Sequence, residues 1–224
     1  MGFNIAVDGP AGAGKSTIAK RAAQELSFIY VDTGAMYRAI ALYFLRHHVC
    51  VEHSEEVEKA CDQIQIEIRY ENQEQQVFLN GENVTAFLRT EEVGNMASVS
   101  SAKPAVRAKL LDLQREIAQK EDVLMDGRDI ASNVLPGAEL KIYLTASVQP
   151  RAERRYQELK EKGTLCNLEE IKKDIEERDY RDMNRDVSPL VKTEDAVLID
   201  SSNMTIDQVV EQILKLYQER RNSL

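Results

Sequence analysis

The stretch that decides the fold of this 224-residue chain is FNIAVDGPAGAGKST, which runs from Phe3 to Thr17. Its apolar start, Phe3 to Val7, is typical of a short buried strand, and Asp8-Gly9-Pro10 is typical of a loop that ends such a strand. Helix-favouring residues follow from about Lys15 to Leu26. The sequence therefore predicts a strand, a glycine-rich loop and a helix in direct succession.

The loop matches the pattern G-x-x-x-x-G-K-[ST], known as a P-loop, at Gly9, Gly14, Lys15 and Ser16. Small residues let backbone N–H groups converge on a phosphate at the positive end of a helix. A flexible Gly/Ala turn is the alternative, but the match lies directly between a predicted strand and a predicted helix. We therefore expect ATP or GTP to bind at Gly9, Pro10, Ala11, Gly12, Ala13, Gly14, Lys15, Ser16 and Thr17.

Two kinds of group in this loop are expected to meet the phosphates directly. Lys15 should reach the β- and γ-phosphates with its mobile charge. A hydroxyl beside it should bind Mg²⁺, and both Ser16 and Thr17 can supply that hydroxyl.

Four further apolar runs predict the rest of a central sheet: Phe28–Val31, Val123–Met125, Leu140–Leu144 and Ala196–Ile199. Predicted helices separate or follow most of them, including one from about Ala35 to Arg46 and one from Pro104 to Lys120. Strands that alternate with helices indicate a parallel sheet covered on both faces. The predicted fold class is thus α/β, a P-loop NTPase-type sheet of five parallel strands.

A different hydrophobic pattern between about residues 60 and 90 predicts a small antiparallel insertion. Ile64, Ile66, Ile68 and Tyr70 alternate with polar residues, which is the period of a half-exposed strand. The segment from Val77 to Val84 holds an Asn-Gly pair between apolar flanks, a strong signal for a hairpin turn. Near the chain end, Thr205 and Gln208 predict a capping box that opens a last helix.

Composition excludes several classes of protein. The chain has 29 Lys and Arg against 38 Asp and Glu, a net charge of −9, whereas a protein that coats nucleic acid should show a basic footprint. The three cysteines form no CxxC pair, which favours reduced thiols over disulfides or a zinc site. No apolar run is long enough to span a membrane. We therefore expect a soluble, cytoplasmic protein, with a monomer as the default.

Arginines suggest what receives the phosphate, because a guanidinium group matches phosphate oxygens bidentately. Arg38 and Arg107 lie near the starts of predicted helices, and Arg128 follows a predicted strand. The residues Arg178, Arg181, Asp182 and Arg185 have the spacing of one helical face. The plainer alternatives are a salt-bridged solvent face for this last group, and an Asp129 that merely pairs with Arg128. No N-K-x-D element follows a later strand, so a small-metabolite kinase is favoured over a switch GTPase.

Taken together, these segments resemble the bacterial cytidylate kinase family of the nucleoside-monophosphate kinase superfamily. The resemblance covers essentially the whole chain and depends on the order and spacing of its motifs. They are residues 8–15 (DGPAGAGK), 32–38 (DTGAMYR), 95–98 (NMAS) with Arg107, 126–129 (DGRD) and 178–185 (RDYRDMNR). Two departures occur: Thr33 stands where Ser is common, and Ser16 stands where many relatives have Gly before Thr17.

The resemblance implies a reaction and a set of roles. ATP and CMP or dCMP would give ADP and CDP or dCDP, with Mg²⁺. Ser98, Arg107 and Asp129 would recognise cytosine, and Asp129 suits this because a carboxylate accepts from an exocyclic amine but repels a uracil carbonyl. The CMP phosphate and sugar would be bound by Thr33, Tyr37, Arg38 and Arg128, and approached from a lid by Arg178, Asp182 and Arg185. Catalytic roles would fall to Lys15, Arg128, Arg178 and Arg185.

The resemblance also divides the chain, which we expect to form a single unit. The core would comprise about 1–34, 104–148 and 188–224, the antiparallel-β/α monophosphate-binding insertion about 35–103, and a short helical lid about 149–187. Two other functions stay open: a kinase for UMP and CMP or for another small metabolite, such as shikimate, and a nucleotide-binding regulator without turnover.

Overall fold

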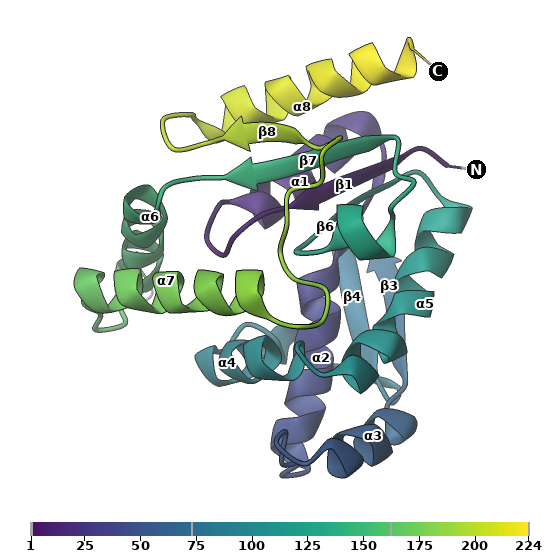
Figure 1. Cartoon of the computed structure of the whole chain (residues 1–224), viewed down its shortest axis with the longest axis vertical. Helices are drawn as coiled ribbons and strands as arrows, with labels where there is room; N and C mark the ends of the chain where they lie inside the picture. Colours follow the sequence, from purple (N-terminus) through teal and green to yellow (C-terminus); the bar gives the residue numbers. More distant parts are fainter. Residues whose placement is uncertain (1, 73, 162, 224) are drawn as a thin grey trace.

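The central sheet of the computed structural model, which describes residues 2–72, 74–161 and 163–223, has five parallel strands in the order β2-β6-β1-β7-β8 (Figure 1). The strands are β1 (Asn4–Asp8), β2 (Ile29–Asp32), β6 (Val123–Gly127), β7 (Leu140–Thr145) and β8 (Val197–Asp200). Each of the five apolar runs identified in the sequence is one of these strands, so the predicted α/β fold class is confirmed.

Helices cover both faces of this sheet. Side chains of β1 alternate between two cores: Ile5 and Val7 pack with α1 (Lys15–Leu26) and α8 (Ile206–Arg221), whereas Ala6 packs with α2 (Thr33–Arg46) and α5 (Pro104–Lys120). Figure 1 shows α8 on one side of the sheet and α2 and α5 on the other. Because a strand places successive side chains on opposite faces, the middle of β1 needs apolar residues at consecutive positions, as Ile5, Ala6 and Val7 provide.

A second, antiparallel sheet of three strands lies between α2 and α5 in the sequence. Its strands are β3 (Ile66–Glu71), β4 (Glu74–Leu79) and β5 (Glu82–Asn83). Asn80 and Gly81 join β4 to β5 with φ of 49° and 84°, the left-handed conformations that a tight hairpin turn requires. The predicted Asn-Gly hairpin is therefore confirmed. The helices α3 (Ser54–Gln63) and α4 (Glu91–Ser100) and the short η1 (Thr85–Phe87) complete this region.

The structure differs from the sequence prediction at one helix start and at one predicted helical face. The helix α2 begins at Thr33 and not at Ala35, because the Asp32 side chain accepts a hydrogen bond from the Ala35 amide at 2.9 Å and so caps the helix two residues earlier. The helix α7 (Leu168–Asn184) ends before Arg185, whose φ of −71° and ψ of 145° are extended. Arg185 therefore does not share a helical face with Arg178.

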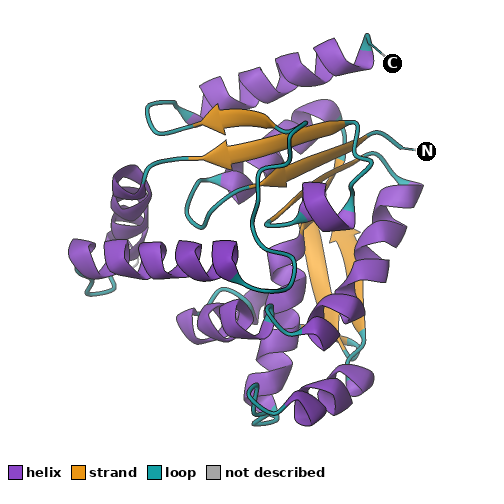
Figure 2. Ribbon diagram, in the orientation of Figure 1, coloured by secondary structure: helices purple, strands orange, loops and turns teal. Residues whose placement is uncertain are grey.

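The helices α6 (Val148–Glu161) and α7 form a hairpin beside the sheet (Figure 2). They pack on each other through a small apolar cluster around Ala152, Ile171 and Ile175. Cys50, Cys61 and Cys166 are all free thiols. Among the described residues, the helices are too short or too polar to cross a membrane.

The capping box at the start of α8 provides a test of local stability. The Thr205 hydroxyl accepts from the Gln208 amide at 3.2 Å, and the Gln208 side chain accepts from the Thr205 amide at 2.9 Å. Thr205→Ala should lower the free energy of unfolding by about 1 kcal/mol and the melting midpoint by about 2–4 °C. Thr205→Ser should melt like the wild type in circular dichroism, and an unchanged midpoint in Thr205→Ala would contradict the assignment.

Candidate functional site

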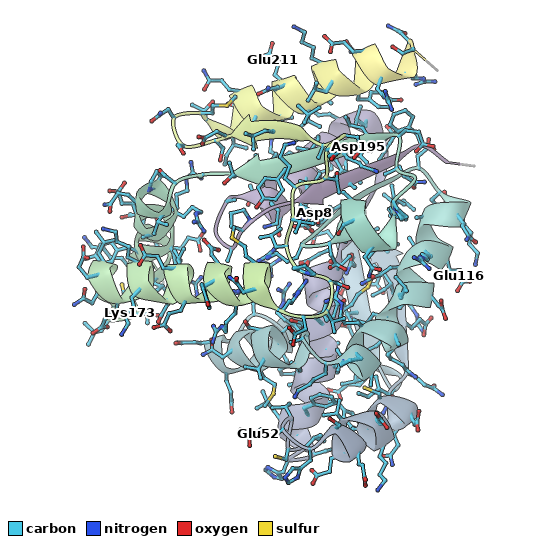
Figure 3. All side chains as sticks on the ribbon, in the orientation of Figure 1. Asp8, Glu52, Glu116, Lys173, Asp195 and Glu211 are labelled. Carbon is cyan, nitrogen blue, oxygen red and sulfur yellow. The ribbon has the colours of Figure 1, made fainter. Side chains whose placement is uncertain are left out.

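The candidate site lies where β1, β2 and β6 end. Parallel register places Asp8 of β1 beside Gly127 of β6, and Asp32 of β2 beside Asp126 of β6. Because parallel strands share one carboxyl edge, the loops that follow them converge there, and ligands of open α/β sheets bind at this edge. Figure 3 shows the Asp8 side chain in the middle of the molecule. The P-loop, Arg128 and Asp129 are therefore neighbours in space.

The P-loop, residues 9–17, has the geometry of a phosphate cradle. Gly9 has a φ of 152°, and a Cβ at this position would lie 1.9 Å from the Leu144 carbonyl oxygen, so only glycine fits. Gly14, with a φ of 82°, is the N-cap of α1, and because glycine has no side chain the first amides of the helix are left without a side-chain cap. Lys15 is buried and donates from Nζ to the Pro10 carbonyl at 2.8 Å. The loop thus presents backbone amides and an ammonium group, as an anion site requires.

Burial lowers the pKa of Lys15, and the nearby Arg128 lowers it further, while Asp126 and Asp8 oppose the shift. The predominant effect is desolvation, which disfavours a charged amine away from water. An anion bound beside Lys15 would stabilise its charged form.

Asp126 organises the side of the P-loop that faces β6. Its carboxylate accepts from the Ser16 hydroxyl at 3.1 Å and from the Tyr30 hydroxyl at 3.0 Å. Burial, followed by the charge of Asp32, raises the pKa of Asp126 to about 6. Thr17, in contrast, is exposed on α1. Ser16 is therefore the P-loop hydroxyl that faces a carboxylate.

The predicted arginines converge on the same edge, and we call Arg38, Arg107, Arg128, Arg178 and Arg185 the arginine cluster. Aspartates from separate elements hold four of its members. Arg38 pairs with Asp32 at 2.9 Å, Arg128 with Asp182 at 2.8 Å, Arg107 with Asp129, and Arg185 lies 3.6 Å from Asp129. These contacts join β2, β6, α5 and α7 around one site.

The plainer alternatives considered for these charges are wrong. Asp129 does not pair with Arg128; its partner is Arg107, while Arg128 reaches Asp182 on α7. The second half of α7 is no simple salt-bridged solvent face either, because Asp179 pairs with the buried Arg151 of α6 at 2.6 Å. In that helix it is Arg181 that points to solvent.

The cluster carries buried donors that have no hydrogen-bond partner within the described part of the chain. They are Arg38 Nε, Arg107 Nε, Arg178 Nε and Arg185 Nη2. Burial, followed by the charge of Arg128, lowers the pKa of Arg178 to about 10. Like charges held together with unsatisfied donors indicate a site for an anion, because unpaired buried polar groups cost free energy.

The residues expected to surround a base lie beside this cluster. Tyr37 of α2 has the Arg107 guanidinium 5.4 Å from its ring centroid, and burial raises its pKa to about 12. The hydroxyl of Ser98, on α4, is buried without a partner among the described residues. The Thr33 hydroxyl donates to the Asp126 carbonyl at 2.8 Å, so it is already engaged.

Sequence reasoning gave no role to Asp8, Tyr30 or Arg151. Arg151 donates to the Ala11 carbonyl of the P-loop at 2.8 Å as well as to Asp179, so it ties α6 and α7 to that loop. The sequence around it, RAERR at residues 151–155, is typical of an ordinary charged helix. Only the fold brings Arg151, Ala11 and Asp179 together, because they lie far apart in the chain.

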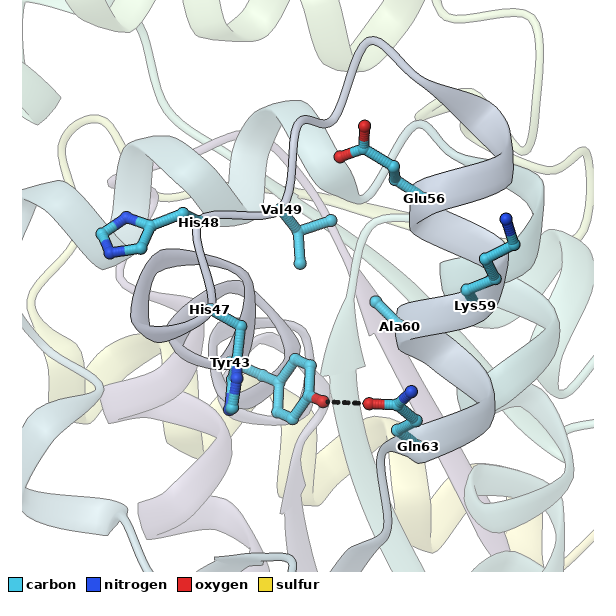
Figure 4. Close-up of a pocket in the computed structure, with 8 residues that line it drawn as sticks. All are labelled: Tyr43, His47, His48, Val49, Glu56, Lys59, Ala60 and Gln63. Carbon is cyan, nitrogen blue, oxygen red and sulfur yellow. Dashed lines mark hydrogen bonds between the residues drawn. The ribbon is translucent and has the colours of Figure 1, made fainter.

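A pocket of about 250 Å³ lies elsewhere, between the end of α2 and α3 (Figure 4). The Tyr43 hydroxyl donates to Gln63 at 3.0 Å across one of its walls. Its lining contains no residue of the P-loop or the arginine cluster; it is formed by Tyr43, His47, His48, Val49, Glu56, Lys59, Ala60 and Gln63. This pocket is therefore separate from the candidate site.

The pair Arg151–Asp179 predicts a large effect on stability. Removing one partner leaves a buried charge alone, so Asp179→Ala should lower the free energy of unfolding by about 3 kcal/mol and the melting midpoint by roughly 6–12 °C. Glu177→Ala, which breaks the exposed contact to Lys173 at 3.9 Å on the same helix, should cost less than about 1 kcal/mol. Figure 3 shows Lys173 at the outer edge of the molecule. Equal losses in the two variants would contradict this account.

Comparison with known proteins identifies the family. The cytidylate kinase family model matches residues 5–219. The cytidylate kinase of Lactobacillus gasseri is 47% identical over 221 residues, which cover 99% of this chain and 96% of the relative, and that of Ligilactobacillus salivarius is 47% identical over 220 residues, 98% of each chain. An uncharacterized protein from Eubacterium ventriosum shares the fold, with a TM-score of 0.53 and 13% identity over 95% of this chain and 96% of that one. The chain therefore belongs to the cytidylate kinase family.

Proposed function

We propose that the protein transfers the γ-phosphate of ATP to CMP or dCMP, giving ADP and CDP or dCDP. The observation that carries this proposal is the convergence of the P-loop and the arginine cluster on one edge of the sheet. A donor site and an anion-binding acceptor site side by side are what phosphoryl transfer requires. Family membership supports the choice of a cytidine nucleotide.

On the donor side, residues 9–17 would hold the ATP phosphates, with Lys15 at the β- and γ-phosphates. Mg²⁺ would lie beside Ser16 and Asp126, because a hydroxyl and a carboxylate oxygen 3.1 Å apart offer the hard oxygen ligands that this ion prefers. Thr17 faces solvent and suits the ion less well. When bound, the ion would neutralise charge on the β- and γ-phosphates.

On the acceptor side, Arg38 and Arg128 would bind the CMP phosphate, next to Thr33 and Tyr37. Guanidinium groups already ordered by Asp32 and Asp182 need little rearrangement to receive an anion. Asp182 would also approach the sugar from the lid.

For the base, Asp129 would accept a hydrogen bond from the exocyclic amine of cytosine, with Ser98 and Arg107 beside it. The unpartnered Ser98 hydroxyl and Arg107 Nε have hydrogen-bonding capacity to spare for a ligand. Uracil presents a carbonyl where cytosine has the amine, so a carboxylate there would disfavour UMP.

The transfer step needs positioning and charge neutralisation more than a strong base. Lys15, Arg128, Arg178 and Arg185 would stabilise the charge that develops on the transferring group, in a setting with little water. The lid, about 149–187, carries two of these arginines and would close over the nucleotides, so that water is excluded and ATP is not wasted by hydrolysis. The core, about 1–34, 104–148 and 188–224, would stay fixed while the insertion, about 35–103, receives CMP.

We further propose that the enzyme works as a monomer in the cytoplasm. All of the residues assigned to the donor and acceptor sites come from one chain, so no second copy has to complete the site. Size-exclusion chromatography with light scattering would measure the mass directly.

An acceptor panel tests the function. With ATP and Mg²⁺, ADP formation should depend on CMP or dCMP, with UMP, AMP, GMP and shikimate poor. Asp129→Ala should lower kcat/KM for CMP by about ten- to hundredfold, the value of a good base contact, and change the Kd of ATP by less than about threefold. Asp207→Ala removes an exposed carboxylate and serves as the control. ATP binding without CMP-dependent ADP would reject the proposal in favour of a regulator, and equal losses in both measurements would reject the role of Asp129.

A second test concerns the metal. Tyr30→Phe removes the hydrogen bond that orients Asp126, which is worth about 1 kcal/mol, so the Mg²⁺ concentration for half-maximal activity should rise about fivefold. Tyr70→Phe is the matched control, because the buried Tyr70 hydroxyl has no partner among the described residues. If both variants need the same Mg²⁺ concentration as the wild type, Asp126 is not oriented in this way.

A further inference from the structure

The short helix η2 (Ile130–Val134) begins directly after Asp129, which occupies its N-cap position. An aspartate at this position ordinarily accepts from the first amides of its own helix. Asp129 makes no such bond here. Its carboxylate instead pairs with Arg107 and accepts from the Asn133 side chain at 3.1 Å.

A residue from another strand caps η2 in its place. Asp8, the last residue of β1, accepts from the Ile130 amide at 2.9 Å through one oxygen and from the Ala131 amide at 2.8 Å through the other. Asp8 is buried, and this burial raises its pKa to about 6, with the two amides opposing the shift. At neutral pH its carboxylate is therefore ionised and can accept both bonds.

Because Asp8 and not Asp129 accepts from the first amides of η2, the Asp129 carboxylate is available for other partners. Without Asp8, the Ile130 and Ala131 amides would be buried without acceptors, which proteins rarely tolerate. The Asp129 carboxylate, on the adjacent residue, is then the group best placed to turn back and cap them. A carboxylate engaged in that cap could not face Arg107 or a ligand.

We propose that Asp8 is a positioning residue for base selectivity: by capping η2 from β1, it leaves the Asp129 carboxylate free to face the cytosine. Asp8 also directly precedes Gly9 of the P-loop. Its side chain therefore connects the P-loop, where ATP would bind, to the turn that carries Asp129, where CMP would bind. This inference rests on the proposed function, because it acts through the role of Asp129.

The test measures selectivity, the ratio of kcat/KM for CMP to kcat/KM for UMP. In Asp8→Asn the amide nitrogen cannot accept a hydrogen bond, so one helix amide loses its acceptor and the ratio should fall about tenfold. In an Asp129→Ala background the same Asp8→Asn change should leave the ratio within about twofold, since the carboxylate through which Asp8 acts is gone.

A purely structural role would behave differently in this cycle. Val210→Ala, a cavity variant in α8 remote from the site, serves as the control for lost stability and should leave the ratio unchanged. Should Asp8→Asn not fold, Asp8→Ser carries the same measurements, since its hydroxyl can still accept from one amide.

Two outcomes would overturn the proposal: a wild-type ratio in Asp8→Asn, or a tenfold fall that persists in the Asp129→Ala background. A wild-type enzyme that does not prefer CMP to UMP would instead overturn the proposed base-reading role of Asp129, and this is measured separately, on the unmodified chain.

Discussion

The parallel register of β1 on β6 is the constraint on which the rest of the structure depends. It places Asp8 beside Gly127, so the loop after β1 and the turn after β6 leave the sheet as neighbours. One loop is the P-loop, and the other carries Arg128 and Asp129. A shift of one residue would reverse which side chains face each core, because alternate residues of β1 enter different clusters. Packing of the sheet therefore fixes the geometry of the site.

Charge is the second organising feature of the site. Guanidinium groups of the arginine cluster are ordered by buried aspartates that come from other elements, as in Arg128–Asp182 and Arg107–Asp129. Such pairs contribute little net stability, because desolvation offsets their attraction. What they provide is a defined arrangement, because each aspartate orients its arginine before any anion binds. This preorganisation is what transfer of a charged phosphoryl group demands.

Much of the fold could be predicted from the sequence, because its signals are local. The strand–loop–helix at the P-loop, the bounds of α1 and α5 and the Asn-Gly hairpin all follow from periodicity, glycine and proline. The site was predictable as a set of residues but not as a set of contacts. Arg128 pairs with Asp182, 54 positions away, and not with the adjacent Asp129. Asp8 caps η2, and Arg151 connects α6 and α7 to the P-loop, only because segments that are distant in the sequence pack together. No local sequence pattern predicts either role.

The central claim is that the P-loop and the arginine cluster form one site that holds a triphosphate and a cytidine nucleotide together. The most direct measurement is a crystal structure with CMP, Mg²⁺ and a non-hydrolysable ATP analogue. The account predicts the triphosphate along the amides of residues 9–17, the CMP phosphate between Arg38 and Arg128, and the cytosine amine at Asp129. CMP bound away from the arginine cluster, or a triphosphate that leaves the P-loop empty, would contradict it.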